Sequence, residues 1–479
     1  MSPQGSGLVV ASNRGPVSWT REEDRLTPRR GFGGLVTALG GALQSEEGEW
    51  VSVALDEPGR EMAARHGQDP FQVEASGSTY TLRLIDVGRR YDAYYNQISN
   101  RLLWFTAHDL WNAPYEPTVV GWTEDWDDGY LPVNRAVGEA VVEAAGSDRE
   151  IFLQDYHLCT TPRFVRDALP NARILHYIHT PWATPEGLRR LPDRLAEELL
   201  RGLLAADVIG ISSPLWADRL RACAVEVLGA HRDGDAILLD DHRTVVADFV
   251  LGVDESDLAT TSASAEARRA GEDLDARLDG RALVLRVDRS DLSKNILRGL
   301  HAFELLLERH PEHRARVWHY AHINPSRQSV PEYAAYLQAC RDLADRITER
   351  FGEDVLTFAV TDDYPRAVAA LERYDVLLAN PVADGTNLVA KEGPALNRRD
   401  GSLILSPTAG AATTMGEAAL LVNPHDVEAT AARLHEALVM DPTERAARAG
   451  CLRAAARVGA PEEWFAAQRE LLRSVTSTR

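Results

Sequence analysis

The stretch Asp384–Glu392, DGTNLVAKE, follows a buried strand pattern, DVLLANPV from Asp375, and opens a helix pattern. In an α/β sheet, a strand, turn and helix in this order bind phosphates where the turn meets the helix. Gly385 allows a ligand to approach the backbone closely, and the uncapped amides of the helix N-terminus suit a diphosphate. Glu392 lies about two turns into that helix, where its carboxylate can accept both hydroxyls of a ribose. The stretch predicts a nucleotide-sugar site; the alternative is an ordinary strand, turn and helix with a solvated Asp and Glu.

Apolar runs of strand length alternate with longer helical patterns throughout the chain. A first series runs from GLVVASNR at Gly7 to DVIGISS at Asp207, and a second from ALVLRVDR at Ala282 to SLILSP at Ser402. A polar, weakly periodic region, residues 233–248, separates them. Strands that alternate with helices predict parallel sheets with helices on both faces. Because 479 residues exceed what a single core normally organises, we expect an α/β chain of two domains.

The expected domains are residues 1–247 and 248–456, followed by a C-terminal helix in residues 457–479. That helix, PEEWFAAQRELLRSV, carries Trp464 and Phe465, which require a core. We expect it to pack back on the first domain.

The composition excludes several classes of protein. A formal net charge of -20 disfavours a general nucleic-acid binder, because binding a phosphate backbone requires clustered Lys and Arg. The chain has no run of about 18 apolar residues and no basic-then-apolar leader, so we expect a cytoplasmic protein without a membrane span. Cys159, Cys223, Cys340 and Cys451 lack paired spacing, which argues against a zinc site or a disulfide framework.

Polar side chains collect where the predicted strands end. Two parallel sheets bind ligands at the carboxyl ends of their strands, and two such edges that face each other form a cleft. The candidates at these edges are Asn13 and Arg14 after the first strand, Asp155 after EIFLQ, His179 after ARILHYI, Arg289 and Lys294 after ALVLRV, and Asp384 after DVLLANPV.

Two cations, Arg289 and Lys294, lie in RSDLSK between a strand and a helix. A cation near a helix N-terminus is unfavourable without an anion, which favours a role in stabilising a leaving diphosphate. GFGGL, residues 31–35, also precedes a helix pattern, and it is either a second diphosphate contact or a plain turn. For Asp155 and His179, structural roles stay open beside contacts with a sugar.

The motifs occur in an order that resembles the trehalose-6-phosphate synthase family of retaining glycosyltransferases, in its bacterial form without a phosphatase domain. The resemblance covers nearly the whole chain and rests on SNRGP, GFGGL, RRYDAYYNQISNRLLW, WDDGYLPVN, DYHL, HTPWATPE, RSDLSKN, ADGTNLVAKE and LSPTAGAA. It implies two Rossmann-like domains that face each other across a cleft, the GT-B glycosyltransferase fold. It also implies transfer of glucose from a nucleotide diphosphate to glucose 6-phosphate with retention, giving α,α-trehalose 6-phosphate.

The resemblance also implies roles for individual residues. The implied catalytic residues are Asp155, His179, Arg289, Lys294 and Asp384. The donor-binding residues are Gly33, Gly34, Arg289, Lys294, Asp362, Asp384, Gly385, Asn387, Leu388, Val389 and Glu392. The acceptor-binding residues are Arg14, Tyr95, Trp104, Asp155 and Arg327, with the two arginines and Tyr95 on the phosphate. No metal or cofactor is implied, because the nucleotide sugar is a substrate, and a homo-oligomer is left open.

The chain departs from the family pattern beside the donor. Thr386 replaces the usual Met of DGMN, Leu292 replaces an aromatic residue, and Pro407–Thr408 replace an acidic and aromatic pair. Asp362 occupies the position that commonly holds an aromatic beside the uracil of UDP. Guanine presents adjacent N–H donors that one carboxylate can accept together, whereas uracil has a single donor between two carbonyls. This difference favours GDP-glucose over UDP-glucose as the donor.

Three alternatives stay open. In the first, Asp362 and Asp363 only cap the helix that follows them, and other residues select the donor. In the second, the chain is a pseudo-glycosyltransferase that couples a cyclitol or amino-sugar analogue. The third is a non-catalytic nucleotide-sugar sensor, which would be expected to lose diphosphate or acceptor residues that this chain retains.

Overall fold

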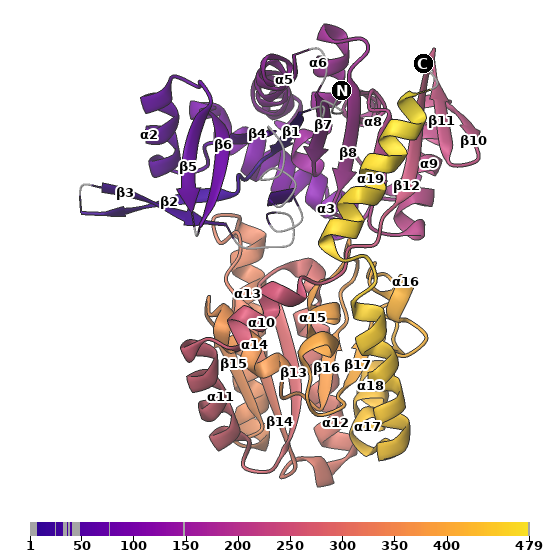
Figure 1. Cartoon of the computed structure of the whole chain (residues 1–479). Helices are drawn as coiled ribbons and strands as arrows, with labels where there is room; N and C mark the ends of the chain where they lie inside the picture. The colour runs from indigo at the N-terminus through magenta and orange to yellow at the C-terminus, as the bar shows by residue number, and fades with distance from the viewer. Residues whose placement is uncertain are drawn as a thin grey trace. The chain divides into compact units, whose positions relative to one another are not determined.

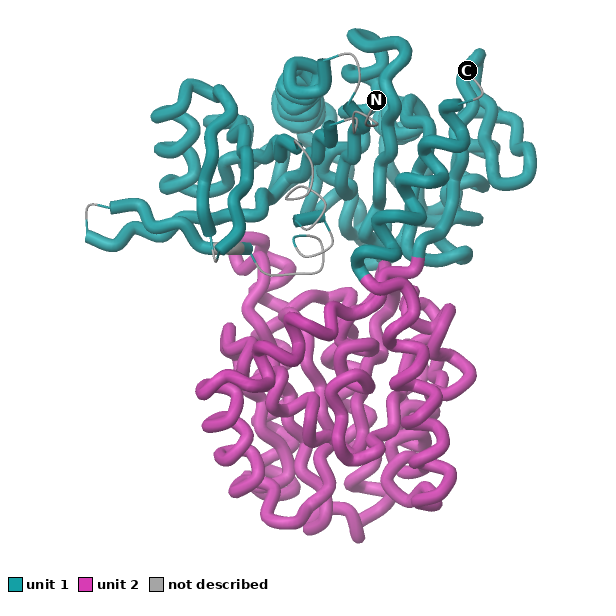
Figure 2. The backbone as a smooth tube through the Cα atoms, viewed as in Figure 1, with its two compact units in different colours: residues 1–249, 461–479 teal, residues 250–460 magenta. Residues whose placement is uncertain are grey.

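The computed structural model describes residues 7–23, 25–31, 36, 39–40, 48–75, 77–146 and 149–477. These form two compact units (Figures 1 and 2). Unit 1 comprises the described residues of Met1–Phe249 and Pro461–Arg479, and unit 2 comprises Val250–Ala460. Each unit is built around its own large sheet.

The sheet of unit 1 has ten described strands in the order β10-β11-β12-β9-β8-β7-β1-β4-β6-β5. Strands β12 through β6 in this order run parallel, and β5, β11 and β10 extend the two edges antiparallel. The central strands β1, β7 and β9 are buried at every position, as expected of parallel strands covered on both faces. The strands are β1 Leu8–Ser12, β4 Gly48–Val53, β5 Phe71–Ala75, β6 Ser78–Ile85, β7 Glu150–Gln154, β8 Arg173–Ile178, β9 Val208–Ile211, β10 His231–Asp233, β11 Ala236–Leu239 and β12 His242–Asp248, with a separate hairpin of β2 Val17–Glu22 and β3 Arg25–Arg30.

Helices follow most of these strands. The α-helices described in unit 1 are α2 Glu57–His66, α3 Trp104–Ala107, α4 Trp122–Asp125, α5 Leu131–Ala145, α6 Thr161–Ala168, α7 Pro185–Leu188, α8 Asp193–Leu203, α9 Pro214–Leu228 and α19 Pro461–Thr476. The remaining helical segments are the 3-10 helices η1 Gly88–Arg90 and η4 Tyr156–Leu158 and the π-helices η2 Asp92–Leu103 and η3 Trp126–Tyr130. Among the helices described in the two units, we find none with the length and apolar character needed to cross a bilayer.

The polar region 233–248 contains strands that the sequence pattern does not predict. Strands β10, β11 and β12 form an antiparallel meander, and β12 then pairs in parallel with β9. Along β12 buried and less buried residues alternate, and the Thr244 hydroxyl donates to the Leu204 carbonyl at 2.7 Å. A strand with one solvent-exposed face, such as β12, lacks the continuous apolar run on which the prediction depended. The region therefore belongs to the sheet of unit 1.

The sheet of unit 2 is parallel throughout, in the order β15-β14-β13-β16-β17-β18. In chain order this is the 3-2-1-4-5-6 arrangement of a doubly wound nucleotide-binding sheet. Its switch point lies between β13 and β16, where ligands bind outside the carboxyl ends of the strands. The strands are β13 Ala282–Arg289, β14 Val317–Asn324, β15 Leu356–Val360, β16 Val376–Ala379, β17 Ser402–Leu405 and β18 Leu420–Leu421.

Two apolar cores lie against the two faces of this sheet. Val284 belongs to the core formed with α12, α13 and α17, whereas Leu283 and Leu285 belong to the core formed with α11, α14 and α18. Successive residues of β13 therefore point to opposite faces. The helical segments of unit 2 are α10 Glu255–Ser262, α11 Ala265–Leu278, η5 Leu292–Lys294, α12 Ile296–Arg309, η6 Pro311–His313, α13 Pro331–Phe351, α14 Tyr364–Leu371, α15 Val389–Leu396, α16 Ala412–Met415, α17 Val427–Val439 and α18 Pro442–Ala456.

The C-terminal helix α19 packs in unit 1, where it contacts β8 and β9 (Figure 1). Trp464 lies edge-on to Tyr177, with ring centroids 4.8 Å apart, and is only 2% exposed. Two arginines of α19 donate to the buried carboxylate of Glu150. Apolar packing and two ion pairs to a buried carboxylate together hold the helix.

Candidate functional site

Lys294 and Asp384 meet at the carboxyl edge of the unit 2 sheet. Lys294 follows β13 and Asp384 follows β16, the two strands that flank the switch point. The Lys294 ammonium donates to Asp384 Oδ2, and the two side chains are 13% and 15% exposed. A cation and a carboxylate at this edge are able to bind a ligand that carries both an anion and hydroxyl groups.

A second carboxylate, Asp291, lies between two arginines of this unit, Arg289 and Arg327. It is fully buried, and its Oδ2 lies 3.9 Å from Arg289 and 3.3 Å from Arg327. Ser293 donates to the same carboxylate from its amide at 3.0 Å and its hydroxyl at 2.9 Å. Arg327 also donates to the Tyr333 hydroxyl at 2.7 Å. Asp291 thus joins the residue predicted for the donor diphosphate to the residue predicted for the acceptor phosphate.

Asp291 is not among the predicted site residues. Its sequence position, inside RSDLSK, suggests a turn residue. Only its contact with Arg327, which lies in the segment between β14 and α13, identifies Asp291 as part of the candidate site. Asp288 on β13 is a second buried carboxylate that is not among the predicted site residues. Burial raises its pKa to about 6, and the neighbouring Arg286 partly counteracts this rise.

The turn that begins at Asp384 is longer than predicted. Asn387, with φ 62°, is its residue in the left-handed region, and its side chain accepts from the Ala390 amide at 3.1 Å. Helix α15 begins at Val389, so Glu392 lies in its first turn and not two turns in. The prediction placed the helix start too early, because the left-handed residue interrupts the helical pattern. Glu392 is partly buried, and burial, followed by the charge of Asp257, raises its pKa to about 7.

Gly385 and Leu388 complete this turn with Val389. The Gly385 carbonyl lies against Gly410. A Cβ on residue 410 would come within 1.8 Å of that carbonyl oxygen, so only glycine fits at position 410. Lys391, one residue before Glu392, is buried and donates to the Leu251 carbonyl at 2.7 Å. Burial lowers the Lys391 pKa to about 8. The lysine anchors α15 within unit 2.

Asp362 and Asp363 have different environments. Asp363 precedes α14 and accepts from the Arg366 amide at 3.0 Å, which is the bond of a helix cap. Asp362 is exposed after the end of β15, where the Asn324 side chain donates to it at 3.0 Å. The helix-cap alternative therefore describes Asp363, and the Asp362 carboxylate faces solvent.

Asp155 and His179 are neighbours in unit 1. Asp155 has φ 73°, and its carboxylate accepts from the His179 amide at 3.2 Å. An Asp in the left-handed region is uncommon and marks a backbone held in place by its surroundings. The His179 ring shares a hydrogen bond of 3.0 Å with Gln154 and packs 4.6 Å from Tyr177. Burial lowers the His179 pKa to about 3, so the imidazole is neutral at neutral pH.

Tyr95 and Asp155 approach the same histidine, His157. The Tyr95 ring stacks on His157 at 5.7 Å, and the Asp155 carboxylate lies 3.7 Å from its Nδ1. Trp104 stacks instead on His108, at 4.0 Å, and is buried.

Three predicted residues remain, Arg14, Gly33 and Gly34. Arg14 is exposed after β1, and its backbone carbonyl accepts from the Ser12 hydroxyl at 2.7 Å. Gly33 and Gly34 lie outside the described residues.

Comparison with known proteins gives a consistent result. The chain matches the model of glycosyltransferase family 20 over residues 6–473. It is 30% identical over 457 residues to the UDP-forming alpha,alpha-trehalose-phosphate synthase of Pichia angusta, covering 91% of this chain and 93% of that protein. It is 28% identical over 479 residues to validamine 7-phosphate valienyltransferase of Streptomyces hygroscopicus subsp. jinggangensis, covering 97% and 94%.

A solved structure extends the likeness to the fold. A UDP-forming alpha,alpha-trehalose-phosphate synthase from Burkholderia xenovorans, in complex with glucose-6-phosphate, matches with a TM-score of 0.81. The two chains are 26% identical, and the match covers 98% of this chain and 100% of that one. Together with the two α/β units, this match confirms the predicted GT-B fold.

Proposed function

Because the chain belongs to glycosyltransferase family 20, we propose that it transfers glucose from a nucleotide diphosphate glucose to glucose 6-phosphate with retention, forming α,α-trehalose 6-phosphate. The observation that carries this proposal is the sheltered pair of Lys294 and Asp384 at the switch point of the unit 2 sheet. The cation suits the diphosphate of a nucleotide sugar, and the carboxylate suits the sugar hydroxyls. The names of two relatives, both UDP-forming synthases, support the same reaction.

The proposed mechanism needs no nucleophile from the protein. The acceptor hydroxyl attacks the anomeric carbon on the face that the diphosphate leaves, and the departing phosphate oxygen takes the hydroxyl proton. Arg289, Lys294 and the N-terminal dipole of α15 stabilise the charge that grows on the diphosphate. The diphosphate draws Lys294 away from Asp384, whose carboxylate then accepts hydroxyls of the sugar. His179 takes part as a neutral group, because burial keeps its pKa at about 3.

We assign the acceptor phosphate to Arg14, Tyr95 and Arg327, and the acceptor sugar to Trp104 and Asp155. A planar guanidinium binds two phosphate oxygens at once, which suits Arg14 and Arg327 for this role. Tyr95 presents its hydroxyl from a ring held by stacking on Tyr91 and His157.

Nucleotide release tests the reaction. The protein is mixed with glucose 6-phosphate and GDP-, UDP- or ADP-glucose, and release of nucleotide diphosphate is followed together with formation of the disaccharide phosphate. We expect release that depends on glucose 6-phosphate, with free glucose a poor substitute. No release with any donor would contradict the proposal. The name of the valienyltransferase relative points to the pseudo-glycosyltransferase alternative, which predicts product only from a cyclitol or amino-sugar acceptor phosphate.

The link made by Asp291 gives a specific prediction. Replacing Asp291 by Asn is expected to raise the KM for glucose 6-phosphate and to lower kcat, because one carboxylate orients Arg327 and Arg289. A charge-assisted hydrogen bond contributes about 1.5 to 3 kcal/mol, or roughly tenfold to 150-fold. Steady-state kinetics in both substrates provide the measurement. Ser293→Ala is the matched control, since it removes only a neutral donor from the same carboxylate. Equal effects of the two variants would count against a positioning role for Asp291.

We further propose that the preferred donor is GDP-glucose. The support comes from Asp362, an exposed carboxylate beyond the carboxyl end of β15, at the edge of the sheet that holds the diphosphate residues. A carboxylate there can accept from N1–H and the exocyclic amine of guanine together. Asp363 is engaged as a helix cap, which leaves Asp362 for the base.

Replacing Asp362 by Ala is expected to lower the ratio of kcat/KM for GDP-glucose to that for UDP-glucose by about tenfold to a hundredfold, the discrimination carried by one bidentate pair. Asp363→Ala is the matched control: it removes the helix cap, so it should weaken stability by about 1 kcal/mol without changing the ratio. An unmutated enzyme that prefers UDP-glucose, or a ratio insensitive to Asp362, would place donor choice elsewhere.

A further inference from the structure

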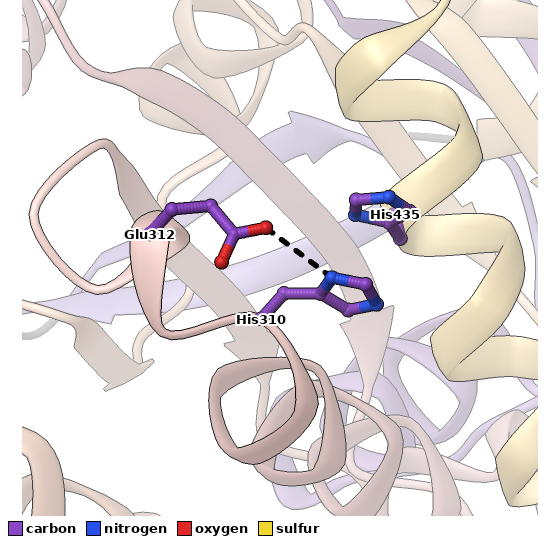
Figure 3. A group of neighbouring side chains, drawn as sticks. All are labelled: His310, Glu312 and His435. Atoms are coloured by element: carbon purple, nitrogen blue, oxygen red, sulfur yellow. Dashed lines mark hydrogen bonds and ion pairs between the residues drawn. The ribbon is translucent and has the colours of Figure 1, made fainter.

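Two histidines and a glutamate, His310, His435 and Glu312, form a cluster in unit 2 (Figure 3). His310 directly follows the C-terminal end of α12, and Glu312 lies in η6, which leads into β14. His435 comes from α17, which packs against α12. The cluster precedes β14 and so lies at the amino edge of the sheet, whereas Lys294 and Asp384 lie at the carboxyl edge.

The geometry brings potential ligand atoms close together. One ligand atom from each of His310, Glu312 and His435 lies within 4.8 Å of the others. The Glu312 carboxylate is 3.3 Å from His310 Nδ1, and the His310 and His435 rings stack with centroids 3.6 Å apart. His313 Nε2 shares a hydrogen bond of 3.0 Å with His435 Nδ1, which leaves His435 Nε2 for a ligand.

We propose that His310, Glu312 and His435 form a binding site for one divalent transition-metal ion of the zinc type. Two imidazoles and one carboxylate make a nitrogen-rich set that zinc favours over calcium or magnesium, which prefer oxygen ligands. Glu312 is 54% exposed and the His310 side chain 32% exposed, so solvent can complete the coordination. His313, through its bond to His435 Nδ1, orients that ring as an outer partner of a metal-bound imidazole commonly does.

Binding requires one change in the side chains. A metal lies in the plane of each imidazole that binds it, and parallel rings 3.6 Å apart have no common plane. The His310 ring therefore has to turn out of the stack, which it can do because it lies beyond the last turn of α12 and is partly exposed. The ion would then neutralise Glu312 and interact favourably with the C-terminal dipole of α12.

The protonation of His313 and His435 agrees with this role. Burial lowers the pKa of both His313 and His435, and their proximity to other histidines lowers it further. Neutral imidazole is the form that binds a metal. A bound ion would tie the end of α12 to α17, and α12 is the helix that begins two residues after Lys294.

Titration of the chelator-treated full chain with Zn²⁺ tests the site. Calorimetry is expected to show one ion per chain. His310→Ala, His435→Ala and Glu312→Gln should each weaken that binding by roughly tenfold or more, since even outer partners of a bound metal contribute about 10- to 100-fold. His301→Ala is the matched control, because His301 and Glu304 form another histidine–carboxylate pair on α12, 3.6 Å apart. Mg²⁺ should give no response.

The same samples provide the contrary outcomes. The proposal would be overturned if a His310→Ala, His435→Ala double variant bound zinc as tightly as the unmutated chain. It would also be overturned if His301→Ala weakened zinc binding as much as the substitutions at the site. Circular dichroism identifies a variant that fails to fold. In that case Co²⁺ added to the unmutated chain decides, since ligation by these residues is expected to give cobalt d–d absorption bands that an equimolar amount of Zn²⁺ removes.

Discussion

Replacing Lys294 by Ala is expected to lower turnover by about 10² to 10³-fold, the usual cost of removing one preorganised group that stabilises transition-state charge. The reason lies in the partner of Lys294. In the free protein the ammonium contacts Asp384, and in the proposed reaction it contacts a diphosphate whose charge grows as the glycosidic bond breaks. An interaction that strengthens toward the transition state affects kcat more than substrate binding. Steady-state and single-turnover release of nucleotide diphosphate provide the measurement.

A second effect of this substitution must be separated from the first. Without Lys294, the Asp384 carboxylate stays sheltered and loses its cation, which destabilises the folded state. The double variant Lys294→Ala, Asp384→Asn removes that charge, so it should recover stability in thermal unfolding without recovering turnover. Arg298→Ala is the matched control, since Arg298 lies on the first turn of α12 and contacts Asn295. Lys294→Ala with near-normal turnover would remove the lysine from the mechanism.

Much of the fold could be predicted from the sequence because buried strands form recognisable apolar runs. Each of the patterns ALVLRVDR, ARVWHYAHI, VLTFAV, DVLLANPV and SLILSP contains a strand of the unit 2 sheet. Parallel strands are covered on both faces, so they appear as uninterrupted apolar runs. The meander of β10, β11 and β12 escaped prediction for the opposite reason, because β10 is polar and exposed, β11 has only four residues, and β12 alternates buried and less buried positions.

The candidate site was predictable where it depends on strand ends. Lys294 and Asp384 follow separate apolar runs, and a parallel sheet brings the ends of such runs to one edge. The structure places these two side chains in contact. Contacts between residues far apart in the sequence were not predictable, because no local sequence pattern indicates them. Asp291 depends on Arg327, and the different environments of Asp362 and Asp363 depend on Asn324 and on where α14 begins.

Replacing Trp464 by Ala is expected to destabilise unit 1 by about 3 to 5 kcal/mol, the usual cost of truncating a buried tryptophan. Trp464 lies on α19, is 2% exposed and packs edge-on to Tyr177, so its removal leaves a cavity beside β8. It also lies 6.2 Å from the ring of His179. We therefore expect a loss of activity at temperatures at which the fold survives, because the cavity lets that ring move.

The stability change is measured by chemical denaturation, with tryptophan fluorescence used to follow the transition of unit 1, since nine of the ten tryptophans belong to that unit. Glu470→Ala is the matched control: Glu470 lies on the exposed side of the same helix, and an exposed substitution should change the free energy of unfolding by about 0.5 kcal/mol or less. Trp464→Phe should fall between the two, since an aromatic ring can keep part of the contact with Tyr177. If all three variants unfold alike, α19 does not depend on Trp464 for its attachment. The ion pairs of Glu150 with Arg469 and Arg473 would then carry that attachment.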